Sequence, residues 1–314
     1  MKLAFIVDPL AQLKAYKDSS VAMMRAAARR GHEIWTIQRA SLSCRDGRVA
    51  ADCLRIEPQA DAANWFTAHE TENLPLTAFA AVLMRQDPPF DTEYIAATWL
   101  LDQAERQGAR VFNRPGAIRD HSEKVALAEF PQFTPPTLVT RQMAEVQAFI
   151  AAHGDTVLKP LDGMGGAGVF RVRHDDPNRN VIVETLTAHG QRTMMAQRYL
   201  PAIVDGDKRI LLIAGEPVPW LLARVPQAGD LRGNLATGAK GEARPLTPRD
   251  REIAVALAPT LWARGILLAG LDVIGDCLTE INVTSPTCFV EITQQTGFDV
   301  AGHFVDALEA ACAG

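Results

Sequence analysis

A lysine followed by a cluster of glycines lies near the middle of the chain. Lys159 ends a short apolar stretch, and the loop after it contains Gly163, Gly165, Gly166 and Gly168. Glycine lets the backbone approach a ligand closely, and consecutive N–H groups in such a loop can bind phosphate oxygens beside a lysine charge. The stretch favours a phosphate-binding loop, although an ordinary glycine-rich hairpin turn is the simpler alternative.

The residues around these glycines argue against two common nucleotide-binding motifs. The spacing matches G-x-G-x-x-G, but a Rossmann fingerprint continues into a helix, whereas residues 169–173 alternate like a strand. No Gly-Lys-Ser/Thr closes the loop, so it is not a Walker loop. We therefore expect a strand, a glycine loop and a second strand that form a hairpin flap.

Three oxygen-bearing side chains near the C-terminus form a candidate metal site. Glu280 and Asn282 are two positions apart in a predicted strand, so they share one face. Asp272 lies in the apolar strand before it, where a buried carboxylate needs a partner. Such hard donors suit Mg²⁺, which fills its octahedron with phosphates and water. The alternative is a set of polar residues on a solvated edge hairpin.

The proposed metal site depends on the register of this hairpin. Asp272 pairs with Glu280 if the connecting loop has three residues, 275–277. A two-residue loop would pair Asp272 with Thr279 and separate the two carboxylates. A metal site formed by these residues therefore predicts the three-residue loop, 275–277.

Size and composition indicate a large globular protein. The 314 residues are 47% hydrophobic, which suggests two or three structural units at roughly 100–200 residues each. A net charge of -5 without a basic tail argues against nucleic acid as a partner. The N-terminal apolar run is too short for a signal peptide, and no stretch approaches the roughly 20 apolar residues of a membrane span. We expect a cytoplasmic protein with no membrane partner, whose five scattered cysteines are reduced thiols.

The first third of the chain has the pattern of an α/β unit. Predicted strands at 2–7 and 33–37 flank a helix that begins after Asp18-Ser19-Ser20, which indicates a parallel sheet. A third predicted strand, 79–84, runs into the proline-containing loop 85–91. Loops at the carboxyl ends of strands are where open α/β sheets bind ligands.

The remaining pattern mixes helices and strands. We expect helices at 115–130, carrying Lys124, and at 142–153, with a linker between them at 133–140. Further predicted elements are an extended segment at 194–200, strands at 207–214, 219–224, 266–274 and 278–283, and a helix from Thr247-Pro248 to Gly265.

A phosphate-binding hairpin, two separated lysines and a Mg²⁺-type carboxylate pair, without a Walker loop, fit the ATP-grasp ligases. Over essentially its whole length the sequence resembles the bacterial glutathione synthetases. The resemblance rests on Met84-Arg85 with 87–91, and on the segments 158–166, 200–202, 205–209, 232–234 and 278–287. The last of these is long and highly specific.

The resemblance implies a fold and a reaction. The fold is α/β, becoming α+β towards the C-terminus: an ATP-grasp fold with a Rossmann-like N-terminal domain (1–122), a central lid domain (123–200) and a C-terminal metal-binding domain (201–314), the ATP-grasp unit spanning about 124–309. The reaction joins γ-L-glutamyl-L-cysteine and glycine to glutathione, releasing ADP and phosphate through an acyl phosphate. It needs no protein nucleophile, only positioning and charge neutralisation. The resemblance also implies ATP with Mg²⁺, or Mn²⁺ in its place, and a homotetramer.

The resemblance also carries roles for individual residues. ATP would be bound by Lys124, Lys159, Gly163, Met164, Gly165, Gly166, Gly168, Met195, Gln197, Tyr199, Leu200 and Asp207. The metal ligands would be Asp272, Glu280 and Asn282. The transferring phosphoryl group and substrate carboxylates would be bound by Arg209, Arg224 and Arg232. The peptide site would contain Asp18, Ser19, Ser20, Arg85, Asp87, Asn234, Ser285 and Thr287. Simpler alternatives are surface ion pairs for the arginines and a plain helix cap for 18–20.

Two positions depart from the family pattern, and two other functions stay open. Gln86 stands where the family has a lysine, and Arg198 where it has a smaller polar residue. The alternatives are another ATP-grasp ligase with a different acid and amine, and a nucleotide-binding protein without catalysis. The segments 85–91 and 232–234, outside the shared ATP machinery, favour the glutathione synthetases, and the complete metal set argues against a silent protein.

Overall fold

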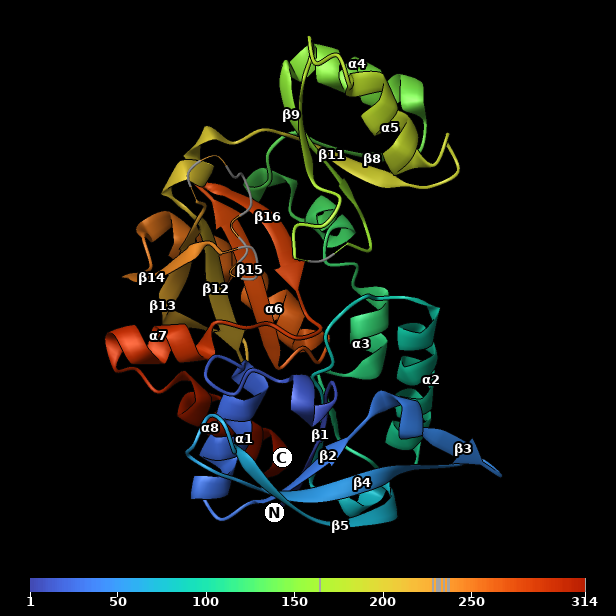
Figure 1. Cartoon of the computed structure of the whole chain (residues 1–314), viewed down its shortest axis with the longest axis vertical. Coiled ribbons are helices and arrows are strands. Elements are labelled where there is room, and N and C mark those ends of the chain that lie inside the picture. The colour runs from blue at the N-terminus through green and yellow to red at the C-terminus, as the bar shows by residue number, and fades with distance from the viewer. Residues whose placement is uncertain (164, 228, 230–232, 234, 236–237, 314) are drawn as a thin grey trace.

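The computed structural model describes residues 1–163, 165–227, 229, 233, 235 and 238–313. Its strands form three β-sheets, which follow one another along the chain (Figure 1). None of the helices in these residues is long and apolar enough to cross a membrane.

The N-terminal sheet has seven strands in the order β3-β4-β2-β1-β6-β7, with β5 paired to β4. Strands β1 (Lys2–Ile6), β2 (Glu33–Ile37), β6 (Ala81–Met84) and β7 (Val111–Phe112) are parallel, as expected, and helices α1 (Ser19–Arg29) and α2 (Thr92–Arg106) accompany them. The sequence did not predict the antiparallel strands β3 (Ser43–Arg45), β4 (Arg48–Pro58) and β5 (Phe66–Pro75). Strand β5 is polar and exposed along almost its whole length, so it has no apolar alternation that would reveal it.

The second sheet has the order β10-β9-β11-β8 and carries two helices on one face, at the top of Figure 1. The elements are β8 (Thr137–Thr140), α4 (Met143–His153), β9 (Asp155–Pro160), β10 (Phe170–Arg173), α5 (Arg179–Thr187) and β11 (Met194–Arg198). The expected hairpin around the glycine loop is confirmed, because β9 and β10 are antiparallel neighbours. The expected linker 133–140 is only partly right, because its last residues form β8 on β11.

The third sheet has the order β14-β13-β12-β15-β16. Its strands are β12 (Asp207–Ile213), β13 (Glu216–Val225), β14 (Lys240–Pro245), β15 (Leu268–Ile274) and β16 (Cys277–Asn282). Side chains alternate along β12, so Ile210 and Leu212 pack towards α6 (Pro248–Ala263), while Leu211 and Ile213 pack towards the C-terminal helices. Thr247 is the N-cap of α6 and Pro248 its first residue, as the sequence predicted, and Thr247 also forms a capping box with Asp250.

The last two helices, α7 (Phe289–Thr296) and α8 (Val300–Ala313), return to the N-terminal sheet. Arg30, at the end of α1, lies 2.5 Å from Asp306 and 3.1 Å from Glu309, both on α8. A single hydrophobic core joins β1, α1, α7 and α8 to one face of the third sheet. This core fixes the N-terminal sheet against the sheet that carries Asp272.

The expected helix 115–130 is wrong in its second half. Helix α3 (Pro115–Asp120) ends early, and a 3₁₀ turn covers Val125–Glu129. The backbone between them bonds to β16 instead, because Ile281 N–H donates to the Glu123 carbonyl over 2.9 Å. Lys124 therefore follows a non-helical segment that is bound to the third sheet. Other 3₁₀ turns cover Leu10–Gln12, Arg39–Ser41, Leu76–Ala78, Pro131–Phe133 and Pro201–Asp205.

The β15–β16 hairpin corrects the expected loop but keeps the expected pairing. Ile274 pairs with Cys277, so the loop has two residues and not three. Asp272 nevertheless pairs with Glu280, because the register shifts by one residue between Asp272 and Val273. Thr279 is the extra residue of this β-bulge, which restores the register that a two-residue loop would otherwise disrupt.

Candidate active site

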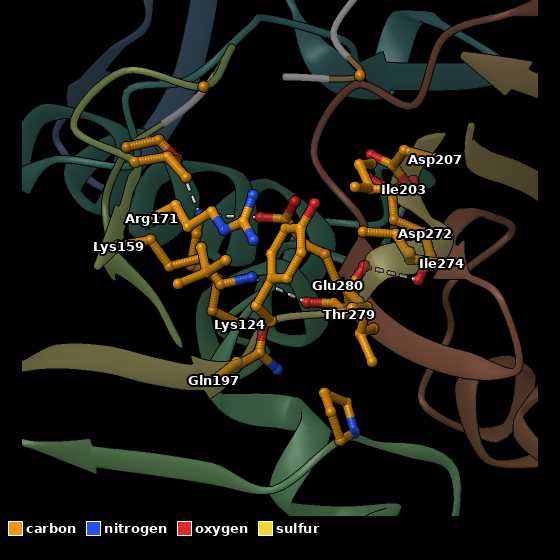
Figure 2. Close-up of a pocket in the computed structure, with 18 of the residues that line it drawn as sticks. Lys124, Lys159, Arg171, Gln197, Ile203, Asp207, Asp272, Ile274, Thr279 and Glu280 are labelled. Carbon is orange, nitrogen blue, oxygen red and sulfur yellow. Dashed lines mark hydrogen bonds and ion pairs between the residues drawn. The ribbon is translucent and has the colours of Figure 1, made fainter. Parts of the chain in front are cut away.

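A cavity of about 330 Å³ lies between the second and third sheets, under the glycine loop. Many of the predicted ATP and metal residues line it (Figure 2): Lys124, Lys159, Gly163, Gly165, Gly166, Gln197, Tyr199, Leu200, Asp207, Asp272 and Glu280. They come from segments more than 150 residues apart, and the fold brings them together.

The two predicted lysines lie side by side at this cavity and face strand β16 (Figure 2). Lys124 Nζ lies 2.8 Å from Glu280 Oε1 and donates a 2.8 Å hydrogen bond to the Gly163 carbonyl. Lys159 Nζ donates to the Thr279 carbonyl over 3.3 Å, and burial lowers its pKa. The pair places positive charge beneath a glycine loop, as a phosphate site requires.

Asp207 and Asp272 line the opposite wall of the cavity, and the predicted residues Arg209 and Arg224 are buried behind them without lining it. Arg209 binds Asp272 through two contacts, of 2.5 and 3.0 Å, and Arg224 lies 3.0 Å from Asp272 and 2.6 Å from Asp207. Burial alone would raise the pKa of Asp272, but the two guanidinium groups hold it well below its usual range. Burial raises the pKa of Asp207 to about 6 despite its contact with Arg224. Asp272 therefore stays ionised at the edge of the cavity.

The three predicted metal ligands share one face of the β15–β16 hairpin. Asp272 pairs with Glu280, and Gly270 pairs with Asn282, so their side chains project to the same side. The Asn282 amide donates to the Gly270 carbonyl over 3.2 Å, which leaves its oxygen as an acceptor. The described residues hold no metal-type group of three or more His, Cys, Asp or Glu. The set here consists of two carboxylates and one amide oxygen, and hard donors of this kind fit Mg²⁺.

Arg171 belongs to this site and was missed by the sequence reasoning. Its guanidinium lies 3.6 Å from the centroid of the Tyr199 ring and binds Asp155 through contacts of 2.5 and 2.9 Å. The register of the β9–β10 hairpin gives the signal that could have found it, because Arg171 pairs with Val157 and both line the cavity. The stacked pair forms one wall next to Gln197.

Some predicted ATP residues lie elsewhere. Met195 is fully buried in the core beneath the third sheet and does not line the cavity. Gly168 stays in the hairpin loop, where a Cβ would meet Pro160 at 3.2 Å. Met164, Arg232 and Asn234 lie outside the described residues.

The predicted peptide-site residues gather in a second, smaller cavity. Its walls include Asp18, Ser19, Ser20, Arg85, Asp87 and Thr287, around a volume of about 40 Å³. Ser285 donates to the Asp87 carboxylate, so it belongs to the same group. Asp18 also caps α1 by accepting from Val21 N–H over 2.9 Å, so the helix-cap alternative is confirmed for this residue.

Two further residues organise this region. Glu123 accepts from Val283 N–H, Thr284 N–H and the Thr284 hydroxyl at 2.8, 3.1 and 2.9 Å, and so ties the segment before Lys124 to the end of β16. Gln86 donates to Asp8 over 3.2 Å. No sequence motif distinguishes Glu123, because its partners lie about 160 residues away.

Two family descriptions match this chain. The prokaryotic glutathione synthetase N-terminal domain covers residues 1–119, and the prokaryotic glutathione synthetase ATP-grasp domain covers residues 123–297. Among curated relatives, the glutathione synthetase of Ralstonia nicotianae is 60% identical over 311 residues, covering 99% of this chain and 96% of the relative. That of Nitrosomonas europaea is 58% identical over 312 residues, covering 98% of each.

Solved structures with low identity share the fold. The D-cycloserine synthetase DcsG has a TM-score of 0.70 at 17% identity, covering 99% of this chain and 100% of that one. A RimK domain protein, an ATP-grasp protein from Sphaerobacter thermophilus, has a TM-score of 0.64 at 20% identity, covering 98% of this chain and 99% of that one. These structural similarities show the ATP-grasp fold. The two family matches and the relatives with identities above 50% show the family as well. The chain belongs to the prokaryotic glutathione synthetase family.

Proposed function

We propose that this chain is an ATP-dependent ligase that joins γ-L-glutamyl-L-cysteine to glycine, giving glutathione, ADP and phosphate. Its family supports the reaction. The observation that supports the residue assignment is that two lysines, a glycine loop and two paired carboxylates line one cavity. Arg85, which lines the cavity that gathers the predicted peptide-site residues, donates to the Pro286 carbonyl over 2.8 Å.

In the proposed reaction, the cysteinyl carboxylate attacks the γ-phosphorus of ATP, and ADP leaves. The amine of glycine then attacks the acyl carbon, loses a proton and displaces phosphate. Lys124 and Lys159 neutralise the phosphate oxygens, and the glycine loop covers them with backbone N–H groups. Arg209 and Arg224, held by Asp272, stabilise the charge on the transferring phosphoryl group and the acyl phosphate.

Asp272, Glu280 and Asn282 would hold Mg²⁺, or Mn²⁺ in its place, and the bound ion would supply charge neutralisation at the phosphates. Gln197, Tyr199 and Leu200 would hold the adenine from strand β11 and the segment after it. Arg232 and Asn234 remain proposed substrate residues on the strength of the family pattern.

We place the domain boundaries at 1–122, 123–200 and 201–314. The division is supported by the three sheets, each of which falls within one of these ranges. We also propose a cytoplasmic homotetramer, which the family resemblance suggests.

The test is phosphate release from MgATP by the purified protein, with γ-glutamylcysteine and glycine added separately and together. The proposal predicts release that needs both substrates, with glutathione identified by mass spectrometry. Release with a different acid and amine would keep the ATP-grasp ligase and overturn these substrates. ATP binding without release under any pair would favour a catalytically silent protein.

A further inference from the structure

Strand β16, which carries two of the proposed metal ligands, is the last strand of the third sheet, so one of its edges pairs with no other strand among the described residues. An edge strand presents N–H and C=O groups that need other partners. The Thr279 carbonyl accepts from Lys159 over 3.3 Å. Glu123 binds the next two positions, because its main-chain carbonyl accepts from Ile281 N–H over 2.9 Å and its carboxylate accepts from Val283 N–H over 2.8 Å. One residue therefore takes the place of a neighbouring strand beside the proposed metal ligands.

A single oxygen atom of Glu123 also holds the chain beyond β16. Its Oε1 accepts from Val283 N–H, from Thr284 N–H and from the Thr284 hydroxyl, at 2.8, 3.1 and 2.9 Å. Three donors on one acceptor atom fix the position of this segment more closely than one hydrogen bond would.

On its other side, Glu123 is joined by a peptide bond to a residue of the proposed phosphate site. Lys124 Nζ lies 2.8 Å from Glu280 Oε1 and donates to the Gly163 carbonyl over 2.8 Å. The main-chain bond from Glu123 to β16 therefore sets how closely Lys124 approaches Glu280 and the glycine loop.

The segment that Glu123 holds continues directly into the proposed peptide site. Ser285 donates to the Asp87 carboxylate, and the Pro286 carbonyl accepts from Arg85 over 2.8 Å. Asp87 and Arg85 both line the smaller cavity. The contacts of Glu123 thus end one residue before the contacts of the peptide site begin.

We infer that Glu123 is a positioning residue that couples the binding of MgATP to the binding of the dipeptide. Glu123 is not one of the described residues that line either cavity, so it acts through the segments on both sides of it. When Lys124 and β16 bind the nucleotide, Glu123 transmits their placement to Ser285 and Pro286, and the dipeptide meets residues that are already in position. By linkage, the dipeptide increases the affinity for MgATP by the same factor. This inference rests on the proposed function.

The test measures binding, so it does not depend on turnover. The dissociation constant of MgAMPPNP, with a non-hydrolysable ATP analogue, is measured by calorimetry without and with saturating γ-glutamylcysteine. The ratio of the two constants, which we call the coupling ratio, should be about 5 or more in the wild type. A wild-type coupling ratio of one would overturn the inference.

Variants of Glu123 then test whether this residue causes the coupling. In Glu123→Ala the coupling ratio should fall towards one, whereas Glu123→Gln keeps an acceptor oxygen in place and should keep most of the ratio. Equal losses in the two variants would contradict a positioning role. Glu129→Gln is the matched control, because Glu129 lies in the same segment and accepts from Arg264 over 3.0 Å at the surface. It should keep the wild-type ratio.

A purely structural role for Glu123 would lower the thermal midpoint and leave the coupling ratio of the folded protein unchanged, and that outcome would overturn the inference. Thr284→Val provides a milder variant if Glu123→Ala does not fold, because it removes one of the three donors and keeps the two main-chain donors. Its coupling ratio should fall about twofold. An unchanged ratio in Thr284→Val would contradict the coupling as well.

The two proposals fail in different ways. A wild-type protein that forms no glutathione overturns the proposed function and the inference with it. A wild-type protein that forms glutathione with a coupling ratio of one, or with a ratio that does not depend on Glu123, overturns only the role of Glu123.

Discussion

Glu280 connects the proposed metal site to Lys124. Its side chain is the more accessible of the two carboxylates at that site, with 23% exposed against 6% for Asp272. We predict that Glu280→Gln lowers the rate of glutathione formation at least 100-fold, because the amide keeps the shape but removes a charge from the metal and lysine contacts. The thermal midpoint should change little, since Glu280 is only partly buried.

The control for this variant is Glu242→Gln, on strand β14 of the same sheet. Glu242 pairs with Lys240 at 2.9 Å and Arg244 at 2.8 Å on the surface. Its substitution should leave the rate unchanged. A Glu280→Gln protein that retains wild-type turnover would contradict the proposed ligand role.

Asp272 stabilises the folded protein in addition to its proposed role as a metal ligand. It is the shared partner of Arg209 and Arg224, and all three side chains are buried. We predict that Asp272→Asn destabilises the protein by about 3 kcal/mol, because removing one member of a buried ion pair leaves uncompensated charge. Thermal unfolding should show a midpoint lowered on the order of 5 °C.

Asp306→Asn provides the comparison for Asp272. Asp306 lies 2.5 Å from Arg30, but its side chain is 63% exposed, and exposed ion pairs contribute about 1 kcal/mol or less. Its midpoint should shift far less than that of Asp272→Asn. Equal shifts would show that the arginine cluster does not depend on Asp272 for its stability.

At the scale of elements, the glycine hairpin is shaped by one close approach. A Cβ at Gly163 would lie 2.8 Å from the Pro160 ring, which is too short for a real contact, and 3.0 Å from the Ala167 carbonyl, which is tighter than most real contacts. The Gly163 carbonyl also accepts from Lys124. We predict that Gly163→Ala raises KM for MgATP about 10-fold or more, because it displaces the loop and the lysine contact together.

The effect should be local to the hairpin, so the thermal midpoint should change little. Gly116→Ala is the matched control, because a Cβ there meets its nearest atoms at 3.5 and 3.6 Å, an ordinary contact. KM for MgATP, measured by phosphate release, should be unchanged in that variant. An unchanged KM in Gly163→Ala would remove the hairpin from the proposed phosphate site.

At the scale of the whole molecule, the segment between the first and second sheets contains a buried histidine. Neither ring nitrogen of His121 has a hydrogen-bond partner among the described residues, and burial lowers its pKa from 6.5 to about 4. The nearby Ile281 backbone opposes this shift in pKa, Arg264 adds to it, and Glu129 opposes it. Between pH 6.5 and 4 the unfolded chain binds the proton and the folded chain does not, so stability falls as the pH falls through this window.

We predict that His121→Gln makes this acid-side decline shallower by up to about 3 kcal/mol, from 1.4 kcal/mol per pKa unit. The measurement is the thermal midpoint from pH 7.5 to pH 4 for the wild type and the variant. The same substitution at the exposed His174 should leave the profile as in the wild type. Parallel profiles for wild type and His121→Gln would contradict the prediction.

The sequence by itself determined the local elements and the chemistry they carry. Periodicity and turn residues are local signals, so the parallel β-α-β opening, the glycine hairpin between β9 and β10, and the cap of α6 were all predictable. The types and spacings of Lys159, Asp272 and Glu280 indicated phosphate and metal chemistry before any fold was known.

Only the tertiary structure decided which of these residues meet. The bulge at Thr279 places Asp272 opposite Glu280 although the hairpin loop has only two residues. The backbone of Glu123 bonds to β16, so Glu123 is not part of the expected helix. Arg85 likewise donates to Ser20 and to the Pro286 carbonyl, which are 65 and 201 residues away in the sequence. Such contacts between distant segments leave no periodic signal in the chain, because they are fixed by burial and hydrogen bonding in the folded molecule.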